Sequence, residues 1–172
     1  VPFAKLDESI GIMKAYSSCV GEGPFTCELF GEEAEELRAA GGEYGAATGR
    51  PRRVGGFDAV ASRYGTKMQG CTYVALTKLD VLSYMKKIPV CTAYEINGKR
   101  TEQFPAGIEE LNAAKPVYEY LPGFRQDISG CRTAEELPKE ALDYIRYIEN
   151  MIHCPVKYVS VGAERDAYIT MF

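Results

Sequence analysis

The chain has 172 residues, with 20 lysines and arginines against 24 aspartates and glutamates, so its formal net charge is −4. This balance argues against general binding to nucleic acid polymers or anionic membranes, which needs a basic excess. No charged-then-apolar pattern typical of a leader opens these residues, and no apolar run approaches the about 20 residues of a membrane helix, so we expect one compact globular domain.

Glycine-rich turns divide the chain into segments that alternate between strand and helix patterns. Residues 9–20 lack helical spacing and end at a glycine turn, which predicts a strand. Residues 30–40 are rich in helix formers and stop at Gly41-Gly42, a usual C-terminal signal. Residues 57–69 place apolar side chains on one helical stripe, and Asp58 lies near its start, where the helix dipole favours an acid.

The rest of the chain continues this alternation. Residues 71–77 are short, apolar and β-rich, which predicts a buried strand leading into a helix near Asp80. Asn97-Gly98 predicts a hairpin between 89–96 and 99–104, because this pair supplies the positive φ angles of a tight turn. A capping box at 133–136 predicts a long helix, followed by a last strand over 155–161. The alternation indicates an α/β fold with a partly parallel sheet and one antiparallel hairpin.

The cysteines and the single histidine give no sign of a metal centre. No two of the six cysteines form a Cys-x-x-Cys knuckle, so we expect no zinc site. A chain of this size does not need disulfides, and we expect reduced, mostly buried thiols in a cytoplasmic protein. His153 lies at a predicted helix end and is expected to cap carbonyl groups.

The segment Thr77-Lys78-Leu79-Asp80 follows a predicted buried strand. Ligands of open α/β sheets bind beyond the carboxyl ends of strands, so this position favours a binding site. The Asp80 carboxylate would accept hydrogen bonds from N1–H and the exocyclic amine of guanine, and adenine, with an acceptor at N1, would be rejected. The stem of Lys78 would lie along the base while its ammonium stays in water. The alternative is a surface helix with Asp80 as its cap.

Residues 45–53, Gly-Ala-Ala-Thr-Gly-Arg-Pro-Arg-Arg, place three arginines within four residues of an acidic chain. The backbone around Pro51 is expected to be extended, so Arg50 and Arg52 would project to the same side. Two guanidiniums beside Thr48 and exposed backbone N–H groups would form a clamp for a carboxylate or a phosphate. The alternative is a solvated basic turn.

Two further turns follow predicted strands but carry weak signals of their own. Val20-Gly-Glu-Gly-Pro24 has too few glycines for a dinucleotide fingerprint, and a simple turn is the alternative for it and for Ser160-Val-Gly162. The chain lacks a Gly-x-x-x-x-Gly-Lys-[Ser/Thr] phosphate loop, because residues 45–49 are one residue too tight and Arg50 replaces the lysine. No Ser–His–Asp or Cys–His constellation emerges from the spacing.

These segments occur in the order and spacing of one family. The chain resembles the C-terminal two-fifths of adenylosuccinate synthetase over essentially its whole length. The arginine loop combined with Leu-Thr-Lys-Leu-Asp is the most specific element, and the resemblance is carried by residues 14–16, 20–25, 43–53, 57–60, 75–82, 115–118, 121–123 and 161–165. It implies that residues 1–172 form the C-terminal portion of a single domain, part of a P-loop-GTPase-like, largely parallel mixed sheet with flanking helices and an antiparallel hairpin.

The resemblance also implies roles for individual residues. Residues 46–52 look like an aspartate-binding loop, made of Ala46, Ala47, Thr48, Gly49, Arg50, Pro51 and Arg52. Arg50 would also contact IMP, as would the main chain of Val20. The GTP side would comprise Arg52, Lys78, Leu79, Asp80, Ser160, Val161 and Gly162. Ala47 stands where many members have a second threonine, which removes one hydroxyl from the loop.

The family's reaction, as the resemblance implies it, joins IMP and L-aspartate to form adenylosuccinate with hydrolysis of GTP. The family's catalytic aspartate and histidine, phosphate loop and Mg²⁺ site belong to an N-terminal portion that this sequence does not match. We therefore expect a fragment of a homodimeric, GTP-dependent ligase of purine biosynthesis, without metal ligands or turnover of its own. The alternative is a non-catalytic nucleotide-binding or assembly module built on the same piece of fold.

Overall fold

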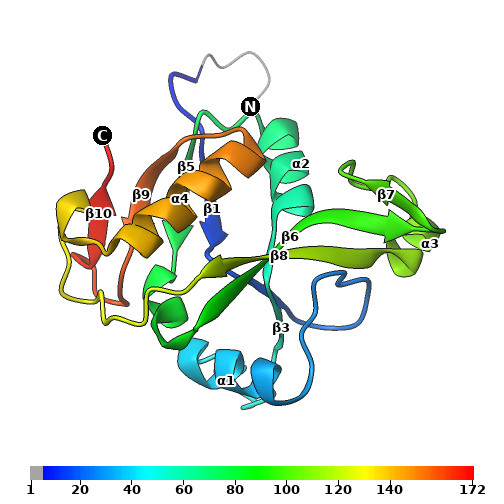
Figure 1. Ribbon diagram of the computed structural model, residues 1–172, viewed down its shortest axis with the longest axis horizontal. Coiled ribbons are helices and arrows are strands. Elements are labelled where there is room, and N and C mark those ends of the chain that lie inside the picture. Colours follow the sequence, from blue (N-terminus) through cyan, green and yellow to red (C-terminus); the bar gives the residue numbers. More distant parts are fainter. Residues whose placement is uncertain (1–5) are drawn as a thin grey trace.

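The computed structural model describes residues 6–172, and its first sheet contains four strands. Their order is β1 (Ile10–Lys14), β5 (Tyr73–Thr77), β9 (Val156–Ser160) and β10 (Tyr168–Thr170). The first three strands run parallel, and β10 pairs antiparallel with β9. The carboxyl ends of three parallel strands therefore meet at one edge of this sheet (Figure 1).

A second sheet is built around one long strand, β6 (Lys87–Ile96). It pairs parallel with the short β4 (Phe57–Asp58) and antiparallel with both β7 (Lys99–Thr101) and β8 (Lys115–Pro122). Figure 1 shows β6 and β8 running together away from the rest of the chain, with β7 and α3 (Ile108–Ala113) at their far end. A separate small ladder joins β2 (Ser17–Cys19) to β3 (Arg53–Gly55).

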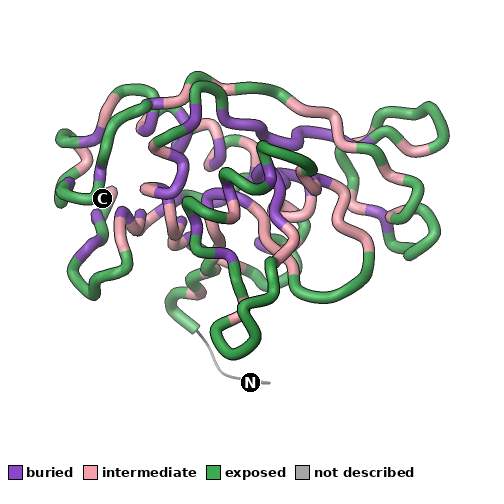
Figure 2. The backbone as a smooth tube through the Cα atoms, turned by 90° about the horizontal axis from the view of Figure 1, so that it is seen from below, coloured by how far each residue is buried: buried purple, intermediate pink, exposed green. Residues whose placement is uncertain are grey.

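The main core lies between the first sheet and α4 (Lys139–Ile152). Helix α4 buries Tyr144, Ile145 and Ile148 at helical spacing, and the Tyr144 hydroxyl donates to the Ala15 carbonyl at 2.6 Å. Helix α1 (Gly31–Gly41) and the 3-10 helix η1 (Leu79–Tyr84) add to this core. Figure 2 shows buried stretches through the middle of the chain and exposed outer loops.

Several sequence predictions are confirmed, including the mixed parallel and antiparallel α/β fold. Helix α1 ends at Gly42 in the left-handed region. Helix α2 (Ala59–Gln69) begins at Asp58, whose side chain accepts from the Ala61 amide at 2.9 Å. The hairpin turn has positive φ at both Asn97 and Gly98, as a tight turn requires.

The predicted single strand over 9–20 is wrong, because it is two strands in different sheets. The Ala15 amide still donates to the Thr77 carbonyl at 2.8 Å, but the Tyr16 side chain then enters the core and β2 pairs with β3 instead. The strand predicted over 155–161 exists as β9 but is not the last, since β10 follows it. Strand β8 was not predicted, because its residues are at most half-buried and show no regular alternation.

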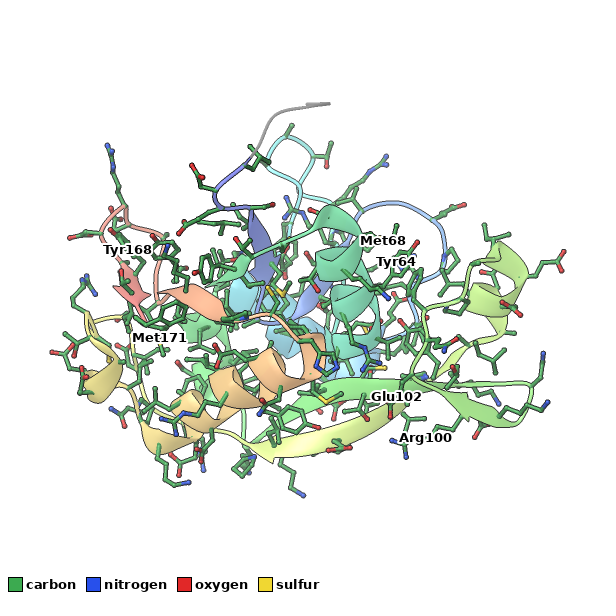
Figure 3. The ribbon with its side chains drawn as sticks, turned by 90° about the horizontal axis from the view of Figure 1, so that it is seen from above. Tyr64, Met68, Arg100, Glu102, Tyr168 and Met171 are labelled. Atoms are coloured by element: carbon green, nitrogen blue, oxygen red, sulfur yellow. The ribbon has the colours of Figure 1, made fainter. Side chains whose placement is uncertain are left out.

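Two helix predictions need correction at their ends. The capping box at Thr133 and Glu136 is present, but it caps the short η2 (Ala134–Glu136), and α4 begins only after Pro138. The apolar stripe predicted over 57–69 is only partly a core stripe, because Phe57 belongs to β4 and Tyr64 and Met68 are exposed. Figure 3 shows Tyr64 and Met68 on the side of α2 that faces the extension made by β6 and β8, and Tyr64 stacks on Phe104 with ring centroids 4.9 Å apart.

The thiols and helices of the described part of the chain add two observations. All six cysteines are free thiols, four of them buried and Cys19 and Cys71 half-buried. None of the helices within residues 6–172 combines the length and the apolar character that crossing a membrane requires.

Candidate nucleotide and carboxylate site

The carboxyl ends of the parallel strands bring together polar residues that are far apart in the sequence. Lys14 ends β1 directly opposite Thr77 of β5, and Lys78 follows β5 immediately. The Lys78 amide donates to the Ser160 hydroxyl at the end of β9, at 3.2 Å. This edge is where open α/β sheets bind ligands, so the two sequence-predicted segments around Lys78 and Ser160 lie side by side at the expected place.

Lys78 adopts a backbone conformation that is uncommon outside glycine, with φ 60°. It precedes η1, and its Nζ donates to the Gly41 carbonyl at 2.6 Å and lies 3.4 Å from Glu43 Oε1. The Lys78 side chain stays 37% exposed, but its ammonium also has protein partners that the sequence did not predict. The ammonium is tied to the end of α1, so the lysine stem is held in one position at the sheet edge.

Asp80 lies in the first turn of η1 and does not act as its cap, because the residue at the cap position is Lys78. Its Oδ1 is buried and has no hydrogen-bond partner within the part of the chain described here. Burial raises the pKa of the Asp80 carboxyl, an effect that the Lys78 charge opposes. A buried acceptor without a partner is unusual in a folded protein, and a ligand with N–H donors would satisfy it.

The residues beside these side chains offer main-chain groups only. Leu79 and Val161 are fully buried and belong to the core. The Val161 amide already donates to the Ala167 carbonyl at 2.9 Å, and the Ser160 hydroxyl donates to the Gly162 carbonyl at 3.4 Å. Any contact from 161 to a ligand would therefore come from its carbonyl.

The loop over 45–50 is a closed turn with an exposed rim. The Gly45 amide donates to the Arg50 carbonyl at 2.9 Å, and the Gly49 amide donates to the Gly45 carbonyl at 2.8 Å. Gly49 has φ 64°, which favours glycine. The exposed residues are Ala46, Ala47, Thr48, Gly49, Arg50 and Pro51. Small side chains on an exposed turn leave its backbone accessible to a ligand.

The three arginines at the end of this turn and just after it, Arg50, Arg52 and Arg53, differ in how many of their N–H donors already have a partner. Arg53 donates to both oxygens of Glu28, at 2.9 and 2.6 Å, and to the carbonyls of Gly21 and Gly23. Arg52 donates from one terminal nitrogen to Glu43 at 3.0 Å, and its buried Nε has no partner among residues 6–172. The Arg50 side chain makes no hydrogen bond or ion pair within the same residues. Arg50 and Arg52 thus keep most of their donors for a ligand, whereas Arg53 already uses four of its five N–H donors.

Val20 lies close to this loop through the small ladder. It follows β2, whose Cys19 pairs with Arg53 of β3, and its side chain is exposed. The bonds from Arg53 to the carbonyls of Gly21 and Gly23 hold the turn after Val20 in place. Arg53 therefore connects the Val20 turn to the arginine loop.

Glu43 is the centre of the cluster, and its role was not predicted from the sequence. Its side chain is completely buried, and Oε1 accepts from Tyr16 at 2.5 Å and from Lys14 at 2.7 Å, while Oε2 faces Arg52. Burial favours the protonated form, but the hydrogen bonds from Lys14, Tyr16 and Arg52 outweigh it and lower the pKa of Glu43 to about 2. Residues 14–16 and 43 contribute to the family resemblance, but no spacing in a single sequence reveals that they meet.

Glu43 links the two sequence-predicted halves of the site. One of its oxygens serves Lys78 on the nucleotide side, and the other serves Arg52 on the loop side. Within residues 6–172 no group of three or more His, Cys, Asp or Glu side chains could hold a metal ion. The cluster is therefore suited to hold anionic and hydrogen-bonding ligands through cations and one free carboxylate, and it does not fit a resident metal.

Comparison with known proteins identifies relatives over nearly the whole chain. A family model described as adenylosuccinate synthetase matches residues 1–169. The adenylosuccinate synthetase of Bifidobacterium adolescentis is 48% identical over 165 residues, which is 96% of this chain and 39% of that protein. The Streptomyces coelicolor enzyme is 50% identical over 165 residues, again with 96% and 39% coverage.

A solved structure shows the same fold. The structure titled as fully ligated adenylosuccinate synthetase from Plasmodium falciparum superposes with a TM-score of 0.91 at 35% identity. It covers 97% of this chain and 40% of the other, so the chain spans about two-fifths of the length of the relatives it matches. The matching family model, the sequence identities and the shared fold agree, and the chain belongs to the adenylosuccinate synthetase family.

Proposed function

We propose that this chain is the C-terminal portion of an adenylosuccinate synthetase, the ligase that joins IMP and L-aspartate with hydrolysis of GTP in purine biosynthesis. In this proposal the segment around Asp80 reads guanine, and the loop 46–52 binds the carboxylates of aspartate. Arg50 contacts IMP together with the main chain of Val20. Arg52 serves the substrate carboxylate and the GTP side.

The observation that carries the proposal is the Asp80 Oδ1, which lacks a hydrogen-bond partner within residues 6–172 and lies beside Lys78; Lys78 in turn shares Glu43 with Arg52. Guanine offers two adjacent N–H donors to a carboxylate, and adenine offers an acceptor in the same place. The main-chain groups of Ser160, Val161 and Gly162 lie on the neighbouring strand end and would close over the base. The two half-sites share one anchor, so a nucleotide and an amino acid would be held in a fixed relation.

The polypeptide of 172 residues would bind without catalysing. Phosphoryl transfer depends on positioning and on neutralising charge around the phosphates, and the described residues offer neither a phosphate loop nor a metal cluster. The Mg²⁺ of the reaction would therefore be held by the remaining part of the synthetase. A cytoplasmic homodimer is the expected state of the full-length enzyme.

Calorimetric titration of the 172-residue chain tests the binding half of the proposal. We expect GDP to bind and ADP to give no heat, and we expect Asp80→Asn to abolish the GDP signal. Glu164→Gln, which changes an exposed acid near β10, serves as the control. Equal binding of GDP and ADP, or binding of neither, would contradict the assignment of Asp80.

A steady-state assay tests the second half. The 172-residue chain, mixed with IMP, L-aspartate, GTP and Mg²⁺, is expected to form no adenylosuccinate, whereas the full-length synthetase that contains it is expected to do so. Measurable product from the chain alone would refute the inactivity that we propose.

A further inference from the structure

We propose that Glu43 is a positioning residue that couples the aspartate and guanine half-sites, by holding Arg52 with one carboxylate oxygen and Lys78 with the other. This inference rests on the proposed function, because it concerns how the same site is organised. It assigns Glu43 a role through other residues and no contact with substrate.

The first argument is how Glu43 divides its two oxygens. Oε2 accepts from Arg52 at 3.0 Å, and Oε1 lies 3.4 Å from Lys78 Nζ and also accepts from Tyr16 and Lys14. Three cationic side chains therefore converge on one carboxylate that is itself fully buried. The side chains of these cations are partly exposed, at 29% for Lys14, 34% for Arg52 and 37% for Lys78. Each can therefore contact a ligand while its ion pair with the buried Glu43 holds it in place.

The second argument is that the backbone around Glu43 fixes the same two partners. The Arg52 amide donates to the Glu43 carbonyl at 2.9 Å, and the Arg38 side chain donates to the Arg52 carbonyl at 2.8 Å. Lys78 Nζ is in turn bound to Gly41, two residues before Glu43. The end of α1 thus places one short segment in contact with both the arginine loop and the residue after β5.

Replacing the carboxylate by an amide tests this arrangement, because an amide has only one acceptor. In Glu43→Gln the side-chain oxygen would stay with Lys14 and Tyr16, which leaves the NH₂ group facing a guanidinium N–H of Arg52. Two donors facing each other repel, so Arg52 would leave its position, and the loss of negative charge would loosen Lys78 as well. Aspartate binding should therefore suffer more than GTP binding.

The experiment is a set of steady-state measurements on the full-length synthetase that carries this chain. We expect Glu43→Gln to raise KM for aspartate about 30-fold or more and KM for GTP by roughly tenfold, the size expected for charge-assisted hydrogen bonds. KM for IMP should stay within about twofold, because neither Arg50 nor Val20 is among the hydrogen-bond and ion-pair partners of the Glu43 side chain within residues 6–172. The readout is the pattern over the three substrates, which a loss of stability alone would not produce.

The matched control is Asp58→Asn. Asp58 is also a buried carboxylate that accepts from a buried tyrosine hydroxyl, Tyr94, at 2.6 Å, but no lysine or arginine within residues 6–172 forms an ion pair with it. We expect this variant to change thermal stability and leave all three KM values within about twofold. A second pair of variants, Tyr16→Phe and Tyr94→Phe, removes the tyrosine hydroxyl and leaves the carboxyl groups of Glu43 and Asp58 in place. This pair tests the proposal if Glu43→Gln does not fold. Tyr16→Phe should raise KM for aspartate and GTP by about threefold, and Tyr94→Phe should raise neither.

The outcomes separate this inference from the function on which it rests. If the unaltered full-length protein does not use IMP, aspartate and GTP, the proposed function fails. If it does, and Glu43→Gln or Tyr16→Phe changes only stability, or raises all three KM values equally, the coupling role of Glu43 is overturned.

Discussion

Two buried carboxylates of this chain each have a tyrosine hydroxyl as their nearest partner, yet their pKa values are shifted in opposite directions. Glu43 accepts a hydrogen bond from Tyr16 at 2.5 Å, and Asp58 accepts one from Tyr94 at 2.6 Å. Burial raises the pKa of Asp58 in spite of its bonds to the Ala61 amide and the Tyr94 hydroxyl. The pKa of Glu43 is instead lowered to about 2, because Lys14, Tyr16 and Arg52 all donate to it.

The difference lies in the cations that surround one carboxylate and not the other. Asp58 begins α2 and holds neutral groups in place, which is a structural task that needs no charge. Glu43 is held ionised by cations that are themselves half-exposed. A buried carboxylate with surplus cations around it indicates a binding site, whereas one that caps a helix and binds a phenol indicates packing.

A third carboxylate extends the comparison and gives the largest expected effect. Among the described residues, Asp80 has neither a tyrosine nor a helix amide on its buried oxygen, so its partner should be the ligand. In the full-length synthetase, Asp80→Asn should lower kcat/KM for GTP by about 10⁴-fold and raise it for XTP, because an amide donates to the C2 oxygen of xanthine. Steady-state kinetics with both nucleotides provide the measurement. Unchanged GTP kinetics would show that Asp80 does not read the base.

Removing one of the three cations around Glu43 should weaken what distinguishes it from Asp58. Arg52→Leu is expected to lower kcat/KM for aspartate by about 10³-fold, since it removes a guanidinium that faces the loop. The neighbouring Arg53 already gives four of its five N–H donors to Glu28 and two carbonyls, so Arg53→Leu should mainly lower the melting temperature. Thermal melting and aspartate kinetics on both variants are the measurements. Similar losses of kcat/KM for aspartate in Arg52→Leu and Arg53→Leu would mean that the number of unused N–H donors does not decide which arginine binds the ligand.

The two carboxylates should also respond to acid in opposite directions. The pKa of Glu43 is lowered from 4.5 to about 2, so its stabilisation is complete above about pH 5 and disappears as pH falls to 2. That stabilisation amounts to about 3 kcal/mol, and the stability gap between wild type and Glu43→Gln should close over this range. Asp58 has a raised pKa, so protonation favours the folded state, and acid should widen the gap between wild type and Asp58→Asn.

Denaturant unfolding at several pH values measures how the difference in free energy of unfolding between wild type and each variant changes with pH. Parallel behaviour of the two variants between pH 7 and pH 3 would contradict the opposite acidities that the surrounding groups imply.

The smallest effect is expected at Arg50, whose side chain makes no ion pair with Glu43 within residues 6–172. The Arg50 side chain is exposed, so its removal should leave the cluster intact. In the full-length synthetase, Arg50→Leu should raise KM for aspartate and for IMP by about tenfold and leave KM for GTP unchanged. A selective rise in KM for GTP would reverse the roles that we propose for the loop.

Sequence reasoning reached the residues that we propose to face the ligands, and it missed Glu43, which joins them. Lys78, Asp80 and the arginine loop follow strands or turns, and such positions are visible from spacing and from turn chemistry. The cluster around Glu43 joins positions 14, 16, 43, 52 and 78, and contacts over such separations depend on the tertiary fold. The prediction of a single strand over 9–20 failed for the same reason, because the side chain of Tyr16 leaves the sheet to reach Glu43 and two strands result.

The last residue of α1 sets a size limit that decides whether this cluster can exist. A methyl group placed on Gly41 would collide with the Tyr16 hydroxyl and come into tight contact with the Tyr16 ring and the Glu43 side chain. The Gly41 carbonyl also accepts a hydrogen bond from Lys78. Alanine at this position would strengthen most helices, by roughly 1 kcal/mol. At position 41, however, alanine would push the Tyr16 hydroxyl away from Glu43. Selection for a more stable α1 is therefore opposed by the space that the Tyr16 ring needs.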